Sequence, residues 1–154
     1  SVYYLANVCG IYRQAITALR TNRQNYLSQV KFFKQELEQK LVNRGYTSGF
    51  LLGQVGDQNT KTSQLRSVWE FCGQVIESGE DNWIKVKVHN SLKIGGVVEI
   101  VKPAYNISKL KIKKIINAGN QQEMPEAHGG GSKDIVLLEV DQVVPKFSVL
   151  RRQI

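Results

Sequence analysis

Two stretches near the start of the chain carry apolar residues at three- and four-residue spacing. The first runs from Val2 to Leu19, the second runs from about Gln24 to Val42, and Gly45 offers a stop after the second. This spacing places apolar side chains on one stripe of an α-helix. We therefore expect two amphipathic helices, whose stripes must be buried against each other or against a domain outside this chain.

The second half of the chain changes to the two-residue period of a β-strand. From Trp83 to Val88, three aliphatic side chains alternate with Trp83 and two lysines, which is typical of a strand with one buried face. Apolar runs at 69–76 and 97–101 lie on either side, and glycines between the runs permit tight turns. We expect these runs to form a β-meander that closes into a small barrel or sandwich. Three later strands are predicted at 109–116, 135–140 and 150–154.

Polar segments separate these regions. Residues 56–64 contain no apolar side chain and are a candidate linker, and the segment 117–133 is rich in glycine and glutamine and is predicted to be a loop. A short apolar run at 50–55 is predicted to be extended. The expected fold class is α+β, with amino-terminal helices followed by a small all-β barrel. The expected parts are a helical segment at 1–45, an extended segment and linker at 46–68, and the β-barrel at 69–154.

The net charge of +8 on 154 residues is concentrated in the β region. Between Ile84 and Ala118 there are eight lysines and a single acid, Glu99. Such a surface favours polyanions, nucleic acid above all, because contacts between lysine and phosphate release counterions. The alternative is that these lysines keep exposed strands soluble and protect sheet edges. Both interpretations stay open.

Eight residues of this region are candidates for binding a substrate or RNA. The alternation of lysines with apolar residues would place the lysines outward on neighbouring strands, as one continuous positive surface. The two aromatic candidates could stack on bases, although aromatic residues of small barrels often belong to the core. The candidates are Lys85, Lys87, Lys93, Lys109, Lys111, Lys113, Trp83 and His89.

Groups that would carry catalysis or bind a metal are scarce. The chain has two histidines, His89 and His128, and neither has cysteines or carboxylates at metal-ligand spacing. Its two cysteines, Cys9 and Cys72, lie far apart in apolar surroundings and are expected to be buried, reduced thiols. The glycine triplet at 129–131 lacks the lysine and hydroxyl of a phosphate loop. We expect a binding module without catalytic residues or metal ligands.

The sequence does not predict a membrane protein. No apolar run is long enough to cross a bilayer, and the first residues lack the basic and apolar regions of a signal peptide. We expect a soluble, cytoplasmic chain with no membrane partner.

Four sequence blocks follow the order of the motifs of one known family. The most specific are Ser1–Arg13, with its tyrosine pair, and Asn43–Phe50, which contains Arg-Gly-Tyr-Thr-Ser-Gly-Phe. Val88–Gly95 and Leu150–Arg152 come later in the chain. Together the blocks resemble peptidase family U32, the collagenase-like peptidases, whose members include the prephenate-dependent tRNA uridine hydroxylases. One departure is the pair Gly95-Gly96, where the family commonly has Gly-Asp.

The resemblance implies that this chain is the carboxy-terminal part of a longer protein. Its β-barrel would then resemble the second domain of translation elongation factors. An upstream α/β domain would hold the chemistry, with a cysteine-rich signature similar to an iron–sulfur ligand set, and no cofactor is expected in this chain. The implied partners are the chain's own upstream catalytic domain and a tRNA or protein substrate.

Two functions of different classes follow from the resemblance. In the first, the chain is a non-catalytic domain that positions a protein substrate for a collagenase-like peptidase. In the second, the chain is the RNA-binding module of a tRNA wobble-uridine hydroxylase. The family name favours the first and the lysine-rich surface favours the second, so both stay open.

Overall fold

The structure is a computed structural model, and it describes residues 1–43, 46, 67–131 and 134–154. Two sequence predictions, the extended run at 50–55 and the candidate linker at 56–64, lie outside the described residues.

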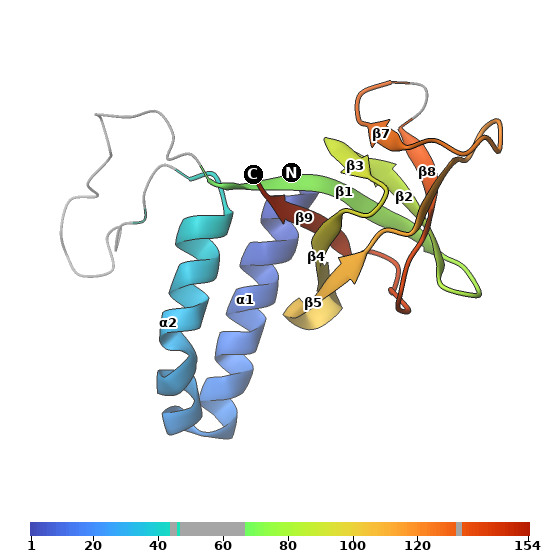
Figure 1. Ribbon diagram of the computed structural model, residues 1–154. Helices are drawn as coiled ribbons and strands as arrows, with labels where there is room; N and C mark the ends of the chain where they lie inside the picture. Colours follow the sequence, from blue (N-terminus) through green and yellow to red (C-terminus); the bar gives the residue numbers. More distant parts are fainter. Residues whose placement is uncertain (44–45, 47–66, 132–133) are drawn as a thin grey trace, which may run out of the picture.

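Two helices form a hairpin at the start of the chain (Figure 1). Helix α1 spans Val2–Thr21 and helix α2 spans Arg23–Lys40, with Asn22 between them. The Asn22 side chain accepts a hydrogen bond from the Gln24 amide and so caps the start of α2. The two predicted helices are confirmed. No helix in the described part of the chain is long and apolar enough to cross a membrane.

An antiparallel β domain follows the helices. Seven strands form one sheet in the order β5-β4-β9-β1-β2-β8-β6, and β3 pairs with β7 in a separate two-stranded sheet. A short 3-10 helix, η1, connects β4 to β5. The bounds are β1 Trp69–Ser78, β2 Trp83–Val88, β3 Ser91–Lys93, β4 Val97–Lys102, η1 Pro103–Tyr105, β5 Asn106–Lys111, β6 Lys114–Asn117, β7 Glu126–His128, β8 Ile135–Glu139 and β9 Val149–Gln153.

The α+β class is confirmed, but the strand order differs from the predicted meander. Strands β1 and β2 pair as a hairpin, as expected, whereas β4 pairs with β5 and β9 instead of β2. The carboxy-terminal strand β9 lies between β1 and β4, so the last residues of the chain complete the sheet. Among the described residues, β5 and β6 are the edges of an open strand order, and closure into a barrel is not confirmed.

The strand predicted at 109–116 is two strands, β5 and β6. The chain turns between them, where the Ile112 amide donates to the Gly96 carbonyl and the Lys113 amide donates to the Glu139 carbonyl. The alternation of apolar residues and lysines breaks at Lys113-Lys114, and this break is the signal in the sequence that one strand ends and another begins. Strands β3 and β7 were not predicted because each has three residues, and β7 falls within a segment predicted to be a loop.

Apolar side chains gather in two cores. The inner core lies inside the β domain and is formed by alternate residues of its strands. The interface core lies between the helices and the outer side of β1, β4 and β9 (Figure 1). Members of the inner core include Val86, Ile100 and Leu138, and members of the interface core include Ile11, Phe33 and Val149.

One of the two cysteine predictions is wrong. Cys72 is a buried free thiol on β1, as expected, but Cys9 is an exposed free thiol on α1. Its surroundings in the sequence are apolar because α1 carries apolar residues on more than one face, and Cys9 lines an open hollow between α1 and the connection from β4 to β5.

Candidate functional site

The sequence-predicted lysines lie on separate parts of the β domain. Lys85 and Lys87 are on β2, whereas Lys109 and Lys111 are on β5 and Lys113 follows β5. We refer to the last three as the β5 lysines. Strands β4, β9 and β1 lie between β5 and β2 in the sheet. The lysines therefore form two groups, with Lys93 apart from both on β3, and not one continuous surface across neighbouring strands.

Two of the six lysines are paired with acids from outside their own strands. Lys85 Nζ is 3.4 Å from Glu77 Oε2, and Lys93 Nζ is 3.4 Å from Glu126 Oε2. Lys87 and the β5 lysines are exposed and form no ion pair with any residue that the structure describes. These four lysines can contact a polyanion without first breaking an ion pair.

The two aromatic candidates have different surroundings. Trp83 is half-buried at the start of β2, and His89 is exposed just after the end of β2. The His89 ring centroid is 4.5 Å from that of Phe71. Gly129 packs so closely on the His89 backbone that a side chain at position 129 would collide with it. This close approach of the two backbones therefore requires a glycine at position 129, the first of the triplet.

The most highly connected polar group is one that sequence reasoning missed. Arg151 of β9 is fully buried between the sheet and the two helices. Its Nη2 atom is 2.7 Å from Glu36 Oε2 on α2 and 2.9 Å from Glu99 Oε2 on β4. Its Nη1 atom donates to Asn7 Oδ1 on α1 at 2.9 Å. One guanidinium therefore joins both helices to two strands.

Lys40 completes the charge balance around Arg151. Its Nζ atom is 2.9 Å from Glu36 Oε1 and 3.0 Å from Glu99 Oε2, and it lies 4.3 Å from the centre of the Trp69 ring. We refer to Glu36, Lys40, Glu99 and Arg151 as the charge cluster. Two cations face two carboxylates, and this pairing offsets much of the cost of removing the charges from water.

The charge cluster keeps Glu36 ionised. Burial alone would raise the pKa of this carboxyl, but the hydrogen bond from Lys40 and the charge of Arg151 outweigh burial and hold the pKa below its ordinary value. The Tyr105 hydroxyl donates to Glu36 Oε2 at 2.8 Å, and burial raises the pKa of this tyrosine. Both Glu36 oxygens are thus engaged, so this carboxylate is not poised to act as a general base.

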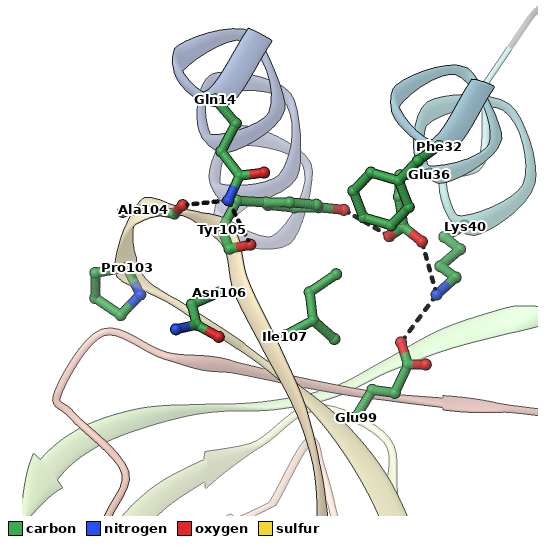
Figure 2. A pocket seen from close by; sticks show the side chains of 10 residues that line it. All are labelled: Gln14, Phe32, Glu36, Lys40, Glu99, Pro103, Ala104, Tyr105, Asn106 and Ile107. Carbon is green, nitrogen blue, oxygen red and sulfur yellow. Dashed lines mark hydrogen bonds and ion pairs between the residues drawn. The ribbon is translucent and has the colours of Figure 1, made fainter. Parts of the chain in front are cut away.

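A cleft of about 610 Å³ opens beside the charge cluster (Figure 2). Side chains from α1, α2, β4 and the connection from β4 to β5 line it. There Gln14 Nε2 donates to the carbonyls of Ala104 and Tyr105, at 3.0 and 3.1 Å. These two residues have φ of 63° and 61°, a conformation that residues other than glycine adopt at a cost. Gln14 therefore ties a strained connection of the β domain to α1.

The residues present do not fit an iron–sulfur cluster. Such clusters are usually held by four cysteine thiolates, and this chain has two cysteines. Cys9 is exposed on α1, whereas Cys72 is buried on β1, and burial raises the pKa of Cys72 to about 12, which opposes thiolate formation. Within the described residues, no group of three histidine, cysteine or acidic side chains is arranged to hold a metal ion.

Sequence reasoning missed the charge cluster because its members lie far apart along the chain. One signal was available. Glu99 interrupts the apolar run at 97–101, and charged residues are rarely covered unless they are paired, whereas Arg151 precedes a second arginine and gives no such signal. The sequence cannot say which partners they meet, since those partners are set by the docking of the helix hairpin on the sheet.

Comparisons with known proteins match this chain to parts of longer proteins. A family profile described as "Peptidase family U32 C-terminal domain" matches residues 67–151. "tRNA hydroxylation protein P" of Haemophilus influenzae is 30% identical over 165 residues, which cover 100% of this chain and 33% of that protein. "tRNA hydroxylation protein P1" of Bacillus subtilis is 29% identical over 106 residues, which cover 67% of this chain and 25% of that protein. The chain thus spans a third or less of the length of these curated relatives.

Two crystal structures are also similar to part of this chain. Both are of the C-terminal domain of a Geobacillus thermoleovorans protein described as a U32 peptidase. The first is 24% identical with a TM-score of 0.47, covering 54% of this chain and 99% of that chain. The second is 23% identical with a TM-score of 0.47, covering 58% of this chain and 98% of that chain.

Proposed function

We propose that this chain, which belongs to peptidase family U32 and has its C-terminal domain at residues 67–151, binds the tRNA substrate of a hydroxylating enzyme. The chain holds the RNA and contributes no catalytic residue, and the reaction takes place in another domain of a longer polypeptide. The observation that carries this proposal is the 30% identity, over the whole chain, to a protein named for tRNA hydroxylation.

The charge distribution supports RNA as the substrate. The chain has a net charge of +8, and Lys87 and the β5 lysines are exposed without an ion pair to any described residue. We propose the β5 lysines as the main phosphate contacts, because Lys109 and Lys111 lie on an edge strand and Lys113 directly follows it. Lys87, Trp83 and His89 form a second contact region around β2, and Lys85 and Lys93 contribute less because each has an acidic partner.

The proposal has three further parts, of which the first concerns the β domain and the other two concern the whole protein. The β domain is a barrel similar to the second domain of translation elongation factors. An upstream catalytic domain holds an iron–sulfur cluster. The protein works in the cytoplasm, where its tRNA substrate is found.

The family name favours a second candidate, in which the domain positions a protein substrate for proteolysis. In that case the exposed lysines are solvated residues that protect the sheet edge. The two candidates differ in their ligand, so direct binding experiments separate them.

Salt-dependent tRNA binding by the full-length protein tests the proposal. Affinity should fall steeply as salt rises. The triple variant Lys109→Ala, Lys111→Ala and Lys113→Ala should flatten the slope of log affinity against log salt by roughly two to three units. A matched control, Lys85→Ala with Lys93→Ala, should change the slope by less than about one unit, because both lysines have acidic partners.

Circular dichroism checks folding, and each lysine replacement should change stability by about half a kcal/mol. An unchanged slope in the triple variant would show that the β5 lysines do not contact the RNA. Absence of any salt-sensitive tRNA binding would contradict the RNA proposal. Gelatin cleavage that survives repeated purification would favour the peptidase role, whereas loss of a hydroxylated uridine from tRNA on gene deletion would support the proposed reaction.

A further inference from the structure

Helix α1 carries apolar side chains on two opposite faces. One face packs against α2 and the sheet, with Tyr3, Ile11 and Ala18 buried. The opposite face is a row of exposed residues at three- and four-residue spacing, which is the spacing of one helix face. This outer stripe consists of Val2, Leu5, Cys9, Tyr12, Ile16 and Leu19.

The outer stripe is unusually apolar for a solvent-facing surface. Leu5 and Tyr12 are 63% and 60% exposed, and Val2, Ile16 and Leu19 are each about half exposed. Single exposed apolar residues are normal, but a contiguous apolar row marks an interaction surface. A helix that is apolar around its circumference is typically a buried helix.

An apolar groove continues the stripe. Tyr12 also lines a groove of about 170 Å³ between α1 and α2, together with Tyr26 and Leu37 of α2. The charged residues of α1, Arg13 and Arg20, lie along one edge of the stripe, four and eleven residues after Cys9. A hydrophobic centre with a pocket and a charged rim is the usual composition of a protein interface.

We infer that the outer stripe of α1 docks onto another domain of the same polypeptide. The matched profile describes a C-terminal domain, and the aligned part covers 33% of the Haemophilus influenzae relative, which leaves about two thirds of that protein for other domains. A domain tethered by a short flexible linker acts at an effective concentration in the millimolar range, so docking within one polypeptide needs less apolar surface than association of separate chains. Both apolar faces of α1 are then covered. This inference does not depend on the proposed RNA role.

Cys9 is an exposed thiol at the edge of the outer stripe, beside the hollow between α1 and the β domain, and serves as a natural reporter of the stripe's coverage. In the full-length protein, iodoacetamide should alkylate Cys9 at least tenfold more slowly than a thiol introduced by Thr17→Cys in a Cys9→Ser background. Thr17 is exposed on the same helix but lies off the stripe. Mass spectrometry of the peptides measures both rates. Cys72, which is fully buried, should stay unreactive in each protein and so reports that the β domain is folded.

A second variant tests whether the stripe itself causes the protection. Leu5→Glu with Ile16→Glu places two carboxylates in the stripe, and burying them is costly. The alkylation rate of Cys9 should then rise at least fivefold while Cys72 stays unreactive. Equal rates for Cys9 and the thiol at position 17, or a Cys9 rate that the two glutamates leave unchanged, would overturn the inference. Protection of Cys9 that disappears on dilution would overturn it in favour of a second copy of the chain.

Discussion

The inner core of the β domain is built from aliphatic side chains, whereas the interface core surrounds buried charges. In the inner core, Val86, Ile100 and Leu138 are fully buried and need no polar partner. In the interface core, Arg151 and Glu36 are buried among the apolar side chains of the helices and the sheet. Aliphatic burial stabilises roughly in proportion to the buried area, whichever apolar groups meet.

Buried ion pairs act differently from apolar contacts. Removing charges from water costs energy that pairing repays only when the geometry is good, so the charge cluster adds little stability compared with an apolar replacement. A misplaced helix, however, would leave a buried charge without its partner. We infer that the inner core holds the β domain together, and that the charge cluster fixes where the helix hairpin sits on it.

The largest loss of stability is expected from Arg151→Ala. This change leaves Glu36 and Glu99 with Lys40 as their remaining cation, so the free energy of unfolding should fall by about 3–5 kcal/mol. Urea unfolding followed by tryptophan fluorescence measures the loss. Arg152→Ala is the matched control, because this neighbouring side chain is 29% exposed and pairs with Glu70. It should cost about 1 kcal/mol or less, and equal losses would contradict the distinction between the two arginines.

Replacing both partners of the closest pair sharpens this test. Arg151→Met with Glu36→Met should recover most of the loss, because Lys40 and Glu99 stay paired and no buried charge is uncompensated. The hairpin should then be held less firmly, so amide hydrogens of α1 and α2 should exchange faster than in the wild type. Unchanged exchange in the double variant would contradict a positioning role for the charge cluster.

Leu138→Ala in the inner core should lower the free energy of unfolding by about 3 kcal/mol, because removing the leucine side chain leaves a cavity among fully buried neighbours. Leu138→Met, which nearly keeps the volume, should cost less than about 1.5 kcal/mol. Urea unfolding at pH 5 and pH 8 should give the same loss for Leu138→Ala, since no titrating group is involved. A loss below about 1 kcal/mol would show that the inner core tolerates cavities.

The inner core could be predicted from the sequence because its signal is local. Ile84, Val86 and Val88 were expected to share a buried face, and all three are buried. The α+β class follows from the same periodicity, and the matched profile confirms the family resemblance that the sequence motifs indicated. Local periodicity does not say which strands are neighbours, so the insertion of β9 between β1 and β4 was not predicted.

The candidate site was only partly predictable for the same reason. The stretch between Ile84 and Ala118 has one acid, but the fold brings Glu77 to Lys85 and Glu126 to Lys93. The charge cluster joins residues from α2, β4 and β9, and no spacing rule connects them. Contacts between distant parts of a chain depend on tertiary packing, which periodicity does not contain.

Titration of Tyr3, a member of the interface core, should lower the free energy of unfolding by about 2 kcal/mol between pH 10 and pH 12. Burial raises the pKa of Tyr3 to about 12, whereas an unfolded tyrosine loses its proton near pH 10. In this window the unfolded state binds fewer protons than the folded state, so the free energy of unfolding falls as pH rises. Urea unfolding at several pH values measures the decline.

Tyr3→Phe should flatten this alkaline decline. It should also cost about 1 kcal/mol at pH 7, because the Tyr3 hydroxyl donates to the Lys40 carbonyl at 2.8 Å. Tyr105, whose pKa is also raised by burial, should leave part of the decline in place. The control Tyr4→Phe changes an exposed side chain of the same helix and should keep the wild-type decline. An equally steep decline in Tyr3→Phe would place the alkaline sensitivity elsewhere.

The smallest loss of stability is expected from Gly10→Ala. Helix propensity alone would predict that this change increases stability. Replacing an interior helix glycine with alanine usually stabilises by about 0.5–1 kcal/mol, but here the new Cβ would lie 2.8 Å from Tyr105 Cδ2. The buried Tyr105 ring is held by its hydrogen bond to Glu36, so relieving the clash should cost more than the gain and leave a net loss of about 1 kcal/mol. Thr17→Ala, at an exposed position of the same helix, should instead stabilise by a few tenths of a kcal/mol, on the order of its propensity difference. A net gain from Gly10→Ala in urea unfolding would mean that Tyr105 shifts freely, and that the charge cluster does not hold α1 in one position against the sheet.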